Sequence, residues 1–568
     1  MADISFIQLL LPIVLHRHWG SLRNQLVKIP TLPLTVSIMT NSALILGILA
    51  PITLLVYYVG FRKSQKLPLP PGPKPLPVVG NIRDLPPSGK PEFQHWSKFK
   101  DLYGPVSSVS VLGATIILLQ DRQSSQEILE KNSMKTYGRP SLLFANEFCG
   151  FDKFLATRPY DAKYRRQRKL IHQQLGTKAV ASKFHNVQDV ESRRFLMHIL
   201  EDPDRLVEHI KLEASAIILK IVYGYSVEQQ TTDPLVNLIE RMMANFSIAM
   251  LPMTWAVDMI PFLRYLPTWF PGTSFHETGQ QWKAITERAM NTPYSFVRDK
   301  MKTRSNRPSF VASLVQKHSQ GADGDEALNK LDEDDIKQAA GTMYGGGADT
   351  TVSSIMSFVL AMMVFPEVQR KAQEEIDNVL GSIRFPQYTD RARLPYVNAL
   401  LWETQRWMPV VPICSAHVAG EDIEYEGLRI PKGAYILSDT WAVLHDPLTY
   451  ADPFEFDPQR YLEPRNEPDP TGEAFGYGRR VCPGRHFADD SLFLTISRLL
   501  ATFDIKVPVD AQGNKVEVKV EATPGLITHP AEYPYDIRPR SENHANLIRS
   551  VKFDHAWEGS DSCCLGII

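Results

Sequence analysis

The sequence predicts a mainly α-helical fold with a smaller β-rich subdomain and an N-terminal membrane anchor. Helical periodicity dominates from about residue 91 onward, alternating apolar and polar residues mark β structure in two places, and residues 42–60 form an uncharged apolar run. Of the 568 residues, 43% are hydrophobic and 22% are charged, which is an ordinary globular composition. The net charge of −1 gives no whole-chain indication of nucleic-acid binding.

The apolar run 42–60, SALILGILAPITLLVYYVG, predicts a transmembrane helix. About 19 helical residues span roughly 28 Å, which is close to the thickness of a bilayer core. Arg62, Lys63 and Lys66 follow directly, and a membrane helix tolerates the kink expected at Pro51. A buried core helix is the alternative. A cleaved signal peptide does not fit, because the run begins about 40 residues into the chain.

A proline-rich stretch and a polar tail flank the globular part of the chain. Six of the fourteen residues in LPLPPGPKPLPVVG (67–80) are proline, which predicts a stiff hinge, with a disordered linker as the alternative. The tail ends in SCCLGII, where Cys563 and Cys564 are candidates for acylation, and its composition favours disorder. We therefore expect an N-terminal extension (1–41), a transmembrane anchor (42–60), a Pro-rich hinge (61–80), a globular domain (81–535) and a polar tail (536–568).

The two β-rich places are residues 106–120 and 422–438. The first, VSSVSVLGATIILLQ, predicts a hairpin that turns at Leu112-Gly113. The second, DIEYEGLRIPKGAYILS, alternates apolar and polar residues around two glycines. Both places predict the β-rich subdomain.

The longest predicted helix runs from Leu331 to Phe365, and a second helix follows from Pro366 to a glycine at 381. Its middle contains GGGADTT (345–351). Three glycines cost a helix about 1 kcal/mol each relative to alanine, so we expect the backbone there to approach a bulky partner closely. A break between two helices is the alternative.

The stretch FGYGRRVCPGRHFAD (475–489) places Cys482 among cationic side chains. Such neighbours lower the pKa of a thiol, and a thiolate acts as a nucleophile or as a metal ligand. The five cysteines of the chain are irregularly spaced and form no CxxC pair, which excludes a disulfide framework and a four-cysteine zinc site. The cationic neighbours are Arg479, Arg480, Arg485 and His486.

Two other pairs have spacings that suit chemistry or packing. Glu403 and Arg406 share one face of an apolar helix, and a buried pair there would need further hydrogen bonds, which Arg460 could supply. The alternative is a surface ion pair. Asp349 and Thr350, an acid and an alcohol beside the glycines, fit a proton relay, although such residues also cap or bend helices.

In their order along the chain, these motifs resemble the cytochrome P450 family. They are the glycine-rich helix with Asp-Thr, ExxR, PxxFxPxR (453–460) and FxxGxRxCxG (475–484), and the match covers roughly residues 65–535. The anchor and hinge resemble the eukaryotic membrane-bound class, and the chain is similar to the fungal O-methylsterigmatocystin oxidoreductase-like group of secondary metabolism. The resemblance implies a cytochrome P450 fold in which 81–535 is a haem-thiolate monooxygenase domain facing the cytosol, held to the endoplasmic reticulum membrane by a single-pass anchor.

On the proximal side, the resemblance assigns Cys482 as the thiolate ligand of the iron in haem b. Phe475 would shield the sulfur from water, while Gly478 and Gly484 would let the loop pass close under the porphyrin.

The resemblance also assigns partners to the haem propionates. Arg480, His417 and Arg168 match family positions that contact them. Tyr164 departs from the pattern, because tryptophan is usual at that position, but its hydroxyl could still donate to a propionate.

On the distal side, Gly346 and Gly347 would make room for O2, and Asp349 and Thr350 would deliver protons during its reduction. Haem activation of O2 would thus depend on a proton supply from this helix. A folding lock under the haem would consist of Glu403, Arg406 and Arg460.

The implied reaction is monooxygenation of a lipophilic small molecule in secondary metabolism, with electrons passing from NADPH through a separate cytochrome P450 reductase. Cytochrome b5 is a possible second donor. A haem-thiolate enzyme that rearranges substrates or uses peroxide, and a catalytically silent haem or scaffold protein, are the alternatives. An acidic partner would dock on Arg165, Arg166, Arg479 and Arg485, and the substrate pocket would involve residues 142–154, 343–348, 410–413 and 526–527.

Overall fold

The computed structural model describes residues 67–319, 330–381, 383–554 and 557–565. The predicted extension (1–41), the anchor (42–60) and the first residues of the hinge (61–66) lie outside the described residues. Within the described part, one helix, Leu331–Val364, is long and apolar enough to cross a membrane, but 72% of its apolar window is buried inside the protein. That helix therefore belongs to the protein core.

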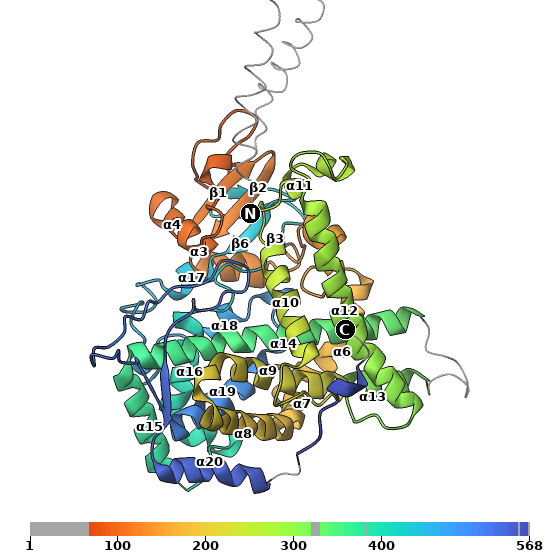
Figure 1. The fold of residues 1–568 in the computed structure, drawn as a ribbon. Coiled ribbons are helices and arrows are strands. Elements are labelled where there is room, and N and C mark those ends of the chain that lie inside the picture. Colours follow the sequence, from red (N-terminus) through yellow and green to blue (C-terminus); the bar gives the residue numbers. More distant parts are fainter. Residues whose placement is uncertain (1–66, 320–329, 382, 555–556, 566–568) are drawn as a thin grey trace, which may run out of the picture.

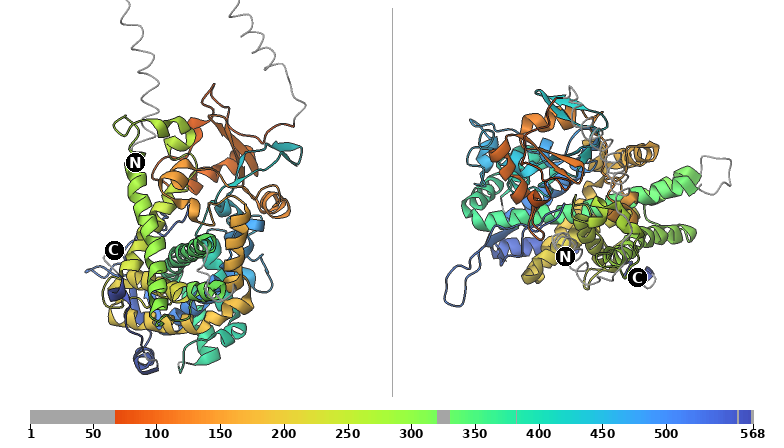
Figure 2. Two further views of the ribbon diagram at one scale, coloured as in Figure 1. Left: turned by 90° about the vertical axis from the view of Figure 1, so that its right-hand side faces the viewer. Right: turned by 90° about the horizontal axis from the view of Figure 1, so that it is seen from above.

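Helices make up most of the molecule and surround α14 (Lys330–Val364), which crosses its middle (Figures 1 and 2). The β-rich part lies at one end, next to the start of the described chain. The other helices are α3 (Glu92–Trp96), α4 (Lys98–Tyr103), α5 (Arg122–Ser125), α6 (Ala162–Leu175), α7 (Lys178–Ala181), α8 (His185–Glu201), α9 (Leu206–Tyr223), α10 (Pro234–Ala249), α11 (Ala256–Met259), α12 (Phe275–Lys302), α13 (Phe310–Ser319), α15 (Pro366–Leu380), α16 (Pro395–Trp407), α17 (Thr440–Leu444), α18 (Thr471–Ala474), α19 (Arg485–Thr502) and α20 (Glu542–Asp554).

The sheets confirm the predicted β-rich subdomain. Its main sheet has the strand order β1-β2-β6-β3, with β1 and β2 antiparallel and β2 and β6 parallel. The predicted hairpin turns at Leu112 (φ 47°) and Gly113 (φ 87°), and left-handed backbone at both positions suits a tight two-residue turn. The strands are β1 (Val106–Val111), β2 (Ala114–Leu119), β3 (His417–Val418), β4 (Ile423–Tyr425), β5 (Leu428–Ile430), β6 (Tyr435–Ser438), β7 (Phe503–Lys506) and β8 (Asp536–Pro539).

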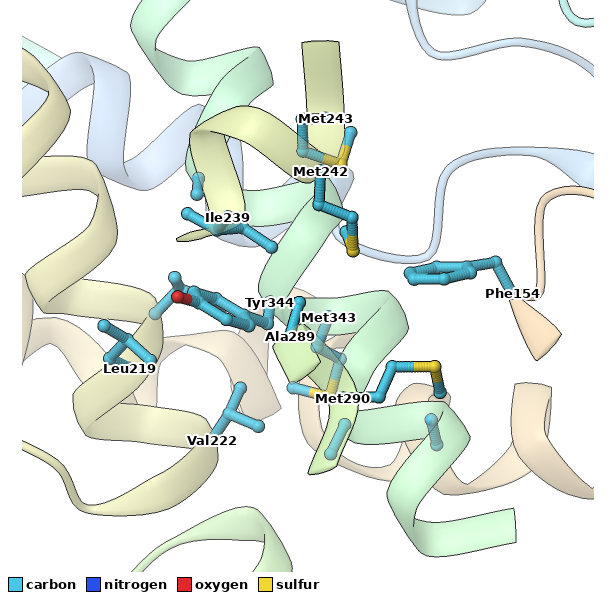
Figure 3. Packing of buried hydrophobic residues seen from close by; sticks show 14 of the residues in the cluster. Phe154, Leu219, Val222, Ile239, Met242, Met243, Ala289, Met290, Met343 and Tyr344 are labelled. Atoms are coloured by element: carbon cyan, nitrogen blue, oxygen red, sulfur yellow. The ribbon is translucent and has the colours of Figure 1, made fainter. Parts of the chain in front are cut away.

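The glycine triplet does not interrupt α14, so the alternative of two helices is wrong. A Cβ at Gly345 would lie 2.9 Å from the Met243 sulfur, and one at Gly347 would lie 2.9 Å from Ile218 Cδ1. These two glycines therefore let α10 and α9 approach α14 closely, as the sequence predicted. Figure 3 shows the same region, with the methionines of α10 beside α14.

The described part of the proline-rich stretch lies against the β-rich end. The Ser108 N–H donates to the Pro71 carbonyl at 2.8 Å, and the Arg429 N–H donates to the Pro68 carbonyl at 2.8 Å. A Cβ at Gly72 would lie 1.9 Å from the Ser108 carbonyl oxygen, so only glycine fits there. A disordered linker is therefore excluded for residues 67–80.

The polar tail is ordered where it is described, so the expectation of disorder is wrong. Strand β8 pairs with β7, and α20 packs on α8 with Ala545, Ile548 and Val551 buried. Farther on, the Ser226 N–H donates to the buried Asp561 carboxylate at 2.9 Å. A buried apolar face and a buried carboxylate that binds a distant backbone N–H therefore offset the polar composition of the tail.

Candidate active site

A cavity of about 370 Å³ lies among α14, α16 and the loop that carries Cys482. It brings together segments that are far apart in the sequence. Of the residues predicted for the site, only Asp349 and Gly478 are not part of its lining. The predicted residues that do line it are Arg168, Gly346, Gly347, Thr350, His417, Phe475, Arg480, Cys482 and Gly484.

The Cys482 thiol lies in the cavity wall, shortly before the first residue of α19. Its backbone N–H donates to the Phe475 carbonyl at 2.9 Å, and Gly476 (φ 75°) turns the chain within the loop. Burial raises the pKa of the thiol, although the Gly484 backbone and the Arg168 guanidinium act in the opposite direction. The arginines act on this pKa in the expected direction, but desolvation outweighs their charge, so the pKa of the thiol is raised and not lowered.

Three arginines and a histidine gather in the lining of the cavity. Arg139, Arg168, Arg480 and His417 all line it, and within the described residues none of the three arginines pairs with a carboxylate. Desolvation and, to a smaller extent, the nearby Arg480 guanidinium lower the pKa of Arg139 to about 10. The pKa of Arg480 is also lowered by desolvation, and that of His417 lies well below its usual value for the same reason.

Backbone carbonyls hold two of these guanidinium groups in place. Arg480 donates to the Tyr137 carbonyl at 2.8 Å and to the Arg158 carbonyl at 2.9 Å, and Arg139 donates to the Ser415 carbonyl at 2.7 Å. Cations that lose hydration without gaining a carboxylate partner need another anion. The lining therefore fits a ligand that carries carboxylates and a metal that binds a thiolate. Haem has both features.

The sequence motifs did not reveal Arg139. It follows Gly138, which approaches β3 so closely that a Cβ would lie 2.8 Å from the Val418 carbonyl oxygen. Its one signal is an isolated Gly-Arg-Pro, which has no distinctive spacing to the other motifs. Only the fold brings this arginine beside Arg480 and His417.

Tyr164 interacts with the cationic residues of the lining differently from the expectation. Its ring lies under the Arg480 guanidinium, 4.1 Å from the ring centroid, which is the geometry of a cation–π contact. Its hydroxyl donates to the Arg479 carbonyl at 3.0 Å. A phenol has one hydrogen to donate, and in this structure the Tyr164 hydroxyl gives it to the backbone, so its donation to a propionate stays a prediction.

Another part of the lining comes from α14, where the Thr350 hydroxyl donates to the Gly346 carbonyl at 2.7 Å. The Asp349 carboxylate lies outside the lining. It faces His529, with 3.2 Å between Asp349 Oδ1 and His529 Nε2, and the two form an ion pair when the imidazole is protonated. The predicted acid and alcohol are therefore adjacent in the helix, but only the alcohol lines the cavity.

The rest of the lining is largely apolar. Of the expected pocket segments, 343–348, 410–413 and 526–527 contribute lining residues, whereas 142–154 contributes only Phe154. Sequence reasoning missed the contributions of α9 and α10, which have no motif of their own. They are Ile218, Met243 and Phe246.

The two glycines of the cysteine loop differ in their surroundings. Gly484 lines the cavity, and a Cβ there would lie 4.0 Å from the Cys482 sulfur. Gly478 (φ 54°) lies outside the lining, and a Cβ there would meet Ser133 at 2.6 Å and the Leu129 carbonyl oxygen at 2.8 Å. Gly478 is therefore required for packing against η2 (Gln126–Lys131) and its following turn, away from the cavity.

The three glycines of α14 allow a stability prediction. A Cβ at Gly346 meets nothing within 4 Å, so Gly346→Ala should stabilise the helix by up to about 1 kcal/mol. Gly347→Ala should lose this gain, because Ile218 would have to move. Urea unfolding followed by circular dichroism measures both variants. Equal shifts in the two variants would contradict this account of the glycines.

Outside the cavity lining, Glu403, Arg406 and Arg460 form a network with fully buried side chains. Arg406 Nε and Nη2 each donate to Glu403 at 2.8 Å, and Arg460 Nε donates to the same carboxylate at 3.0 Å. The Tyr461 hydroxyl adds a bond of 2.9 Å, and Arg406 also donates to the Pro453 carbonyl at 2.7 Å. The predicted help from Arg460 is confirmed, and the alternative of a surface pair is wrong.

A helical fold that places the Cys482 thiol, an alcohol-bearing helix and guanidinium groups without carboxylate partners around one cavity is suited to enclosing an anionic metal cofactor. Comparison with known proteins identifies the family. The model of the family described as Cytochrome P450 matches residues 70–535. The chain belongs to the cytochrome P450 family.

Similar proteins support the same assignment. The chain is 50% identical to cytochrome P450 monooxygenase CLM2 of Gibberella zeae, over 90% of this chain and 97% of that one. It is 44% identical to multifunctional cytochrome P450 monooxygenase af510 of Aspergillus fumigatus, over 89% and 94% of the two chains. O-methylsterigmatocystin oxidoreductase of Aspergillus flavus is 37% identical, over 88% and 93%. The protein is thus an enzyme, a cytochrome P450 monooxygenase related to fungal ones.

The fold also matches a solved structure. A zebra fish cytochrome P450, solved with abiraterone, superposes with a TM-score of 0.61 at 22% identity, covering 79% of this chain and 100% of that one. At this identity, the likeness shows the fold alone. The predicted cytochrome P450 fold is confirmed.

Proposed function

We propose that this monooxygenase binds haem b and inserts one atom of O2 into a lipophilic small molecule of secondary metabolism, with electrons from NADPH through a separate reductase. The observation that carries the proposal is the cavity itself, which places the Cys482 thiol, unpaired guanidinium groups and the Thr350 hydroxyl around one space. Similarity to an enzyme named for O-methylsterigmatocystin supports the substrate class.

The lining residues divide the work of binding haem. Cys482 would ligate the iron, and Arg139, Arg168, Arg480 and His417 would bind the propionates. When bound, haem supplies the activation of O2 and accepts electrons one at a time. The backbone N–H groups at the start of α19 would stabilise the thiolate, because a helix N-terminus favours negative charge.

The remaining predicted residues have positions that suit supporting roles. Phe475 lines the cavity beside Cys482 and would keep water from the sulfur, while Gly484 lets the loop pass close to the macrocycle. Gly346 leaves open space for O2, whereas Gly347 contributes through its packing on Ile218. The apolar lining favours a lipophilic substrate, because such a surface gains free energy by excluding water.

The electron donor would dock at a basic cleft next to the cysteine loop. A second cavity, about 580 Å³ and open to solvent, is lined by Arg165, Arg168, Lys169, His172 and Arg479 among others. Of the expected docking residues, Arg166 is engaged by Asp335, with Nε 2.6 Å from the carboxylate, and Arg485 is exposed beyond the cleft. Cytochrome b5 would use the same face.

The cell location follows from the segment that precedes the described domain. The apolar run 42–60 would anchor the enzyme in the endoplasmic reticulum membrane with one span, leaving the domain in the cytosol. The described chain begins at the β-rich end, so that end would face the membrane (Figure 1).

A reduced-plus-CO difference spectrum of the purified protein tests the proposed cofactor and ligand. We expect a Soret band at the position of thiolate-ligated haem. NADPH with reductase should support product formation from substrate without added peroxide. Absence of the band would refute the cofactor assignment. Turnover that peroxide supports but NADPH with reductase does not would refute the electron source.

Thr350→Ala should keep that Soret band but uncouple NADPH use from product formation. The hydroxyl lines the cavity and directly follows the predicted acid in α14, so its loss should remove a proton donor while Cys482 and the cationic residues stay in place. Hydrogen peroxide formed per NADPH consumed measures the effect. Full coupling in this variant would show that Thr350 has no part in proton delivery.

A further inference from the structure

The Asp349 carboxylate pairs with His529, a residue outside all of the sequence motifs described above. Within the described residues, His529 is the side chain that pairs with Asp349, with 3.2 Å between Nε2 and Oδ1. The exposed fractions of the two side chains are 24% and 18%. The pair therefore lies between solvent and the inner part of α14, one residue away from the cavity-lining Thr350.

The loop that carries His529 is fixed on several sides. The Ser353 hydroxyl of α14 donates to the Thr528 carbonyl at 2.6 Å, and the Thr528 N–H donates to the Val410 carbonyl at 2.9 Å. The Ser247 hydroxyl of α10 donates to the Ile527 carbonyl at 3.0 Å. The imidazole is thus presented to Asp349 from a rigid support.

His529 is also held locally. Its backbone N–H donates to the Thr523 hydroxyl at 2.9 Å, and its carbonyl accepts from the Thr523 N–H at 2.8 Å. The neighbouring Leu526 and Ile527 line the cavity. One short loop therefore contributes to the substrate wall and binds the acid on the other side of that wall.

We propose that His529 is a positioning residue for proton delivery: its imidazole holds the Asp349 carboxylate at the outer side of α14, next to Thr350. Without this partner, a partly exposed carboxylate can turn to other rotamers and to water. Holding it in one place keeps an acid within reach of both the solvent and the alcohol of the cavity. The inference rests on the proposed monooxygenase function and adds a residue to it.

Proton delivery can be measured without knowing the substrate. With NADPH, reductase and O2 alone, one O2, one NADPH and one proton give hydrogen peroxide and NADP⁺. When two further protons and electrons arrive, one O2, two NADPH and two protons give two water molecules and two NADP⁺. Atoms and electrons balance in both reactions. The ratio of peroxide to water therefore reports the supply of protons.

His529→Leu should raise the ratio of peroxide to water by up to about fivefold, the factor that corresponds to losing a partly exposed ion pair of about 1 kcal/mol. His529→Gln, which keeps an N–H donor on a similar reach, should stay near the wild-type ratio. His185→Leu is the matched control, since His185 also pairs with a partly buried acid, Asp490 at 2.9 Å, away from the cavity. Its ratio should not change.

A second measurement needs no haem turnover. The purified full chain is unfolded in urea as wild type, Asp349→Asn, His529→Leu and the double variant. We expect the two substitutions to be non-additive by about twofold to fivefold in the unfolding equilibrium constant, because the second one removes a partner that is already lost.

An unchanged peroxide ratio in His529→Leu, an equal rise in His529→Gln, or strict additivity in urea would overturn the proposal. Each of these outcomes can be distinguished from failure of the proposed monooxygenase function. If the wild type consumed no NADPH with reductase, the electron source would be wrong, while the urea cycle would still decide whether His529 holds Asp349.

Discussion

Cys482→Ser should abolish the Soret band of thiolate-ligated haem and reduce turnover to background. The structure places this thiol in the cavity wall, with its backbone fixed to the Phe475 carbonyl at 2.9 Å, so the serine variant keeps the loop but loses the soft ligand. A reduced-plus-CO spectrum of the variant, at equal protein concentration, measures the loss. Circular dichroism should remain that of the wild type.

Cys414→Ser provides the matched control. Cys414 also lines the cavity, but its sulfur accepts from the Ser438 N–H at 3.0 Å, and burial raises its pKa to about 11. It is thus a neutral hydrogen-bonded thiol in the wall, and its serine variant should keep the band. A band that survives in Cys482→Ser and disappears in Cys414→Ser would assign the ligand to the other cysteine.

The sequence predicts this site well where a motif joins local structure to chemistry. The run from Phe475 to Gly484 fixes its own turn, and ExxR places Glu403 and Arg406 one helical turn apart. Such features depend on near neighbours in the chain. They could therefore be recognised before the fold was known.

The sequence fails to predict features that depend on distant segments. Arg139 and Ile218 reach the cavity only through tertiary packing, and neither has a local signature. The raised pKa of Cys482 was missed for the same reason, because neighbouring charges can be counted along the chain but burial cannot.

The C-terminal tail was mispredicted although it contained a usable signal. Ala545, Ile548 and Val551 follow the spacing of one helix face, and all three are buried. The polar composition of the whole tail obscured this short apolar stripe. Periodicity is the better guide there, because one buried stripe is enough to dock a helix.

Glu403→Ala should prevent stable folding. The substitution leaves the Arg406 and Arg460 guanidinium groups fully buried without their shared carboxylate, and it removes the acceptor of the Tyr461 hydroxyl and the Asp457 N–H. Breaking a buried ion pair by removing one partner costs about 3–5 kcal/mol, which is much of the roughly 5–15 kcal/mol that holds a domain folded. Soluble yield and the midpoint of urea unfolding measure the effect.

Glu374→Ala is the control for this prediction, because it removes a carboxylate from a salt bridge at the protein surface. Glu374 pairs with Arg370 on α15, where both side chains are more than half exposed, so water and salt already screen the interaction. Its unfolding midpoint should stay close to that of the wild type. If Glu403→Ala unfolded at the same urea concentration as Glu374→Ala, the buried network would not stabilise the fold. Glu403→Gln should fall between the two, since an amide oxygen still accepts from the guanidinium groups but carries no charge to offset them.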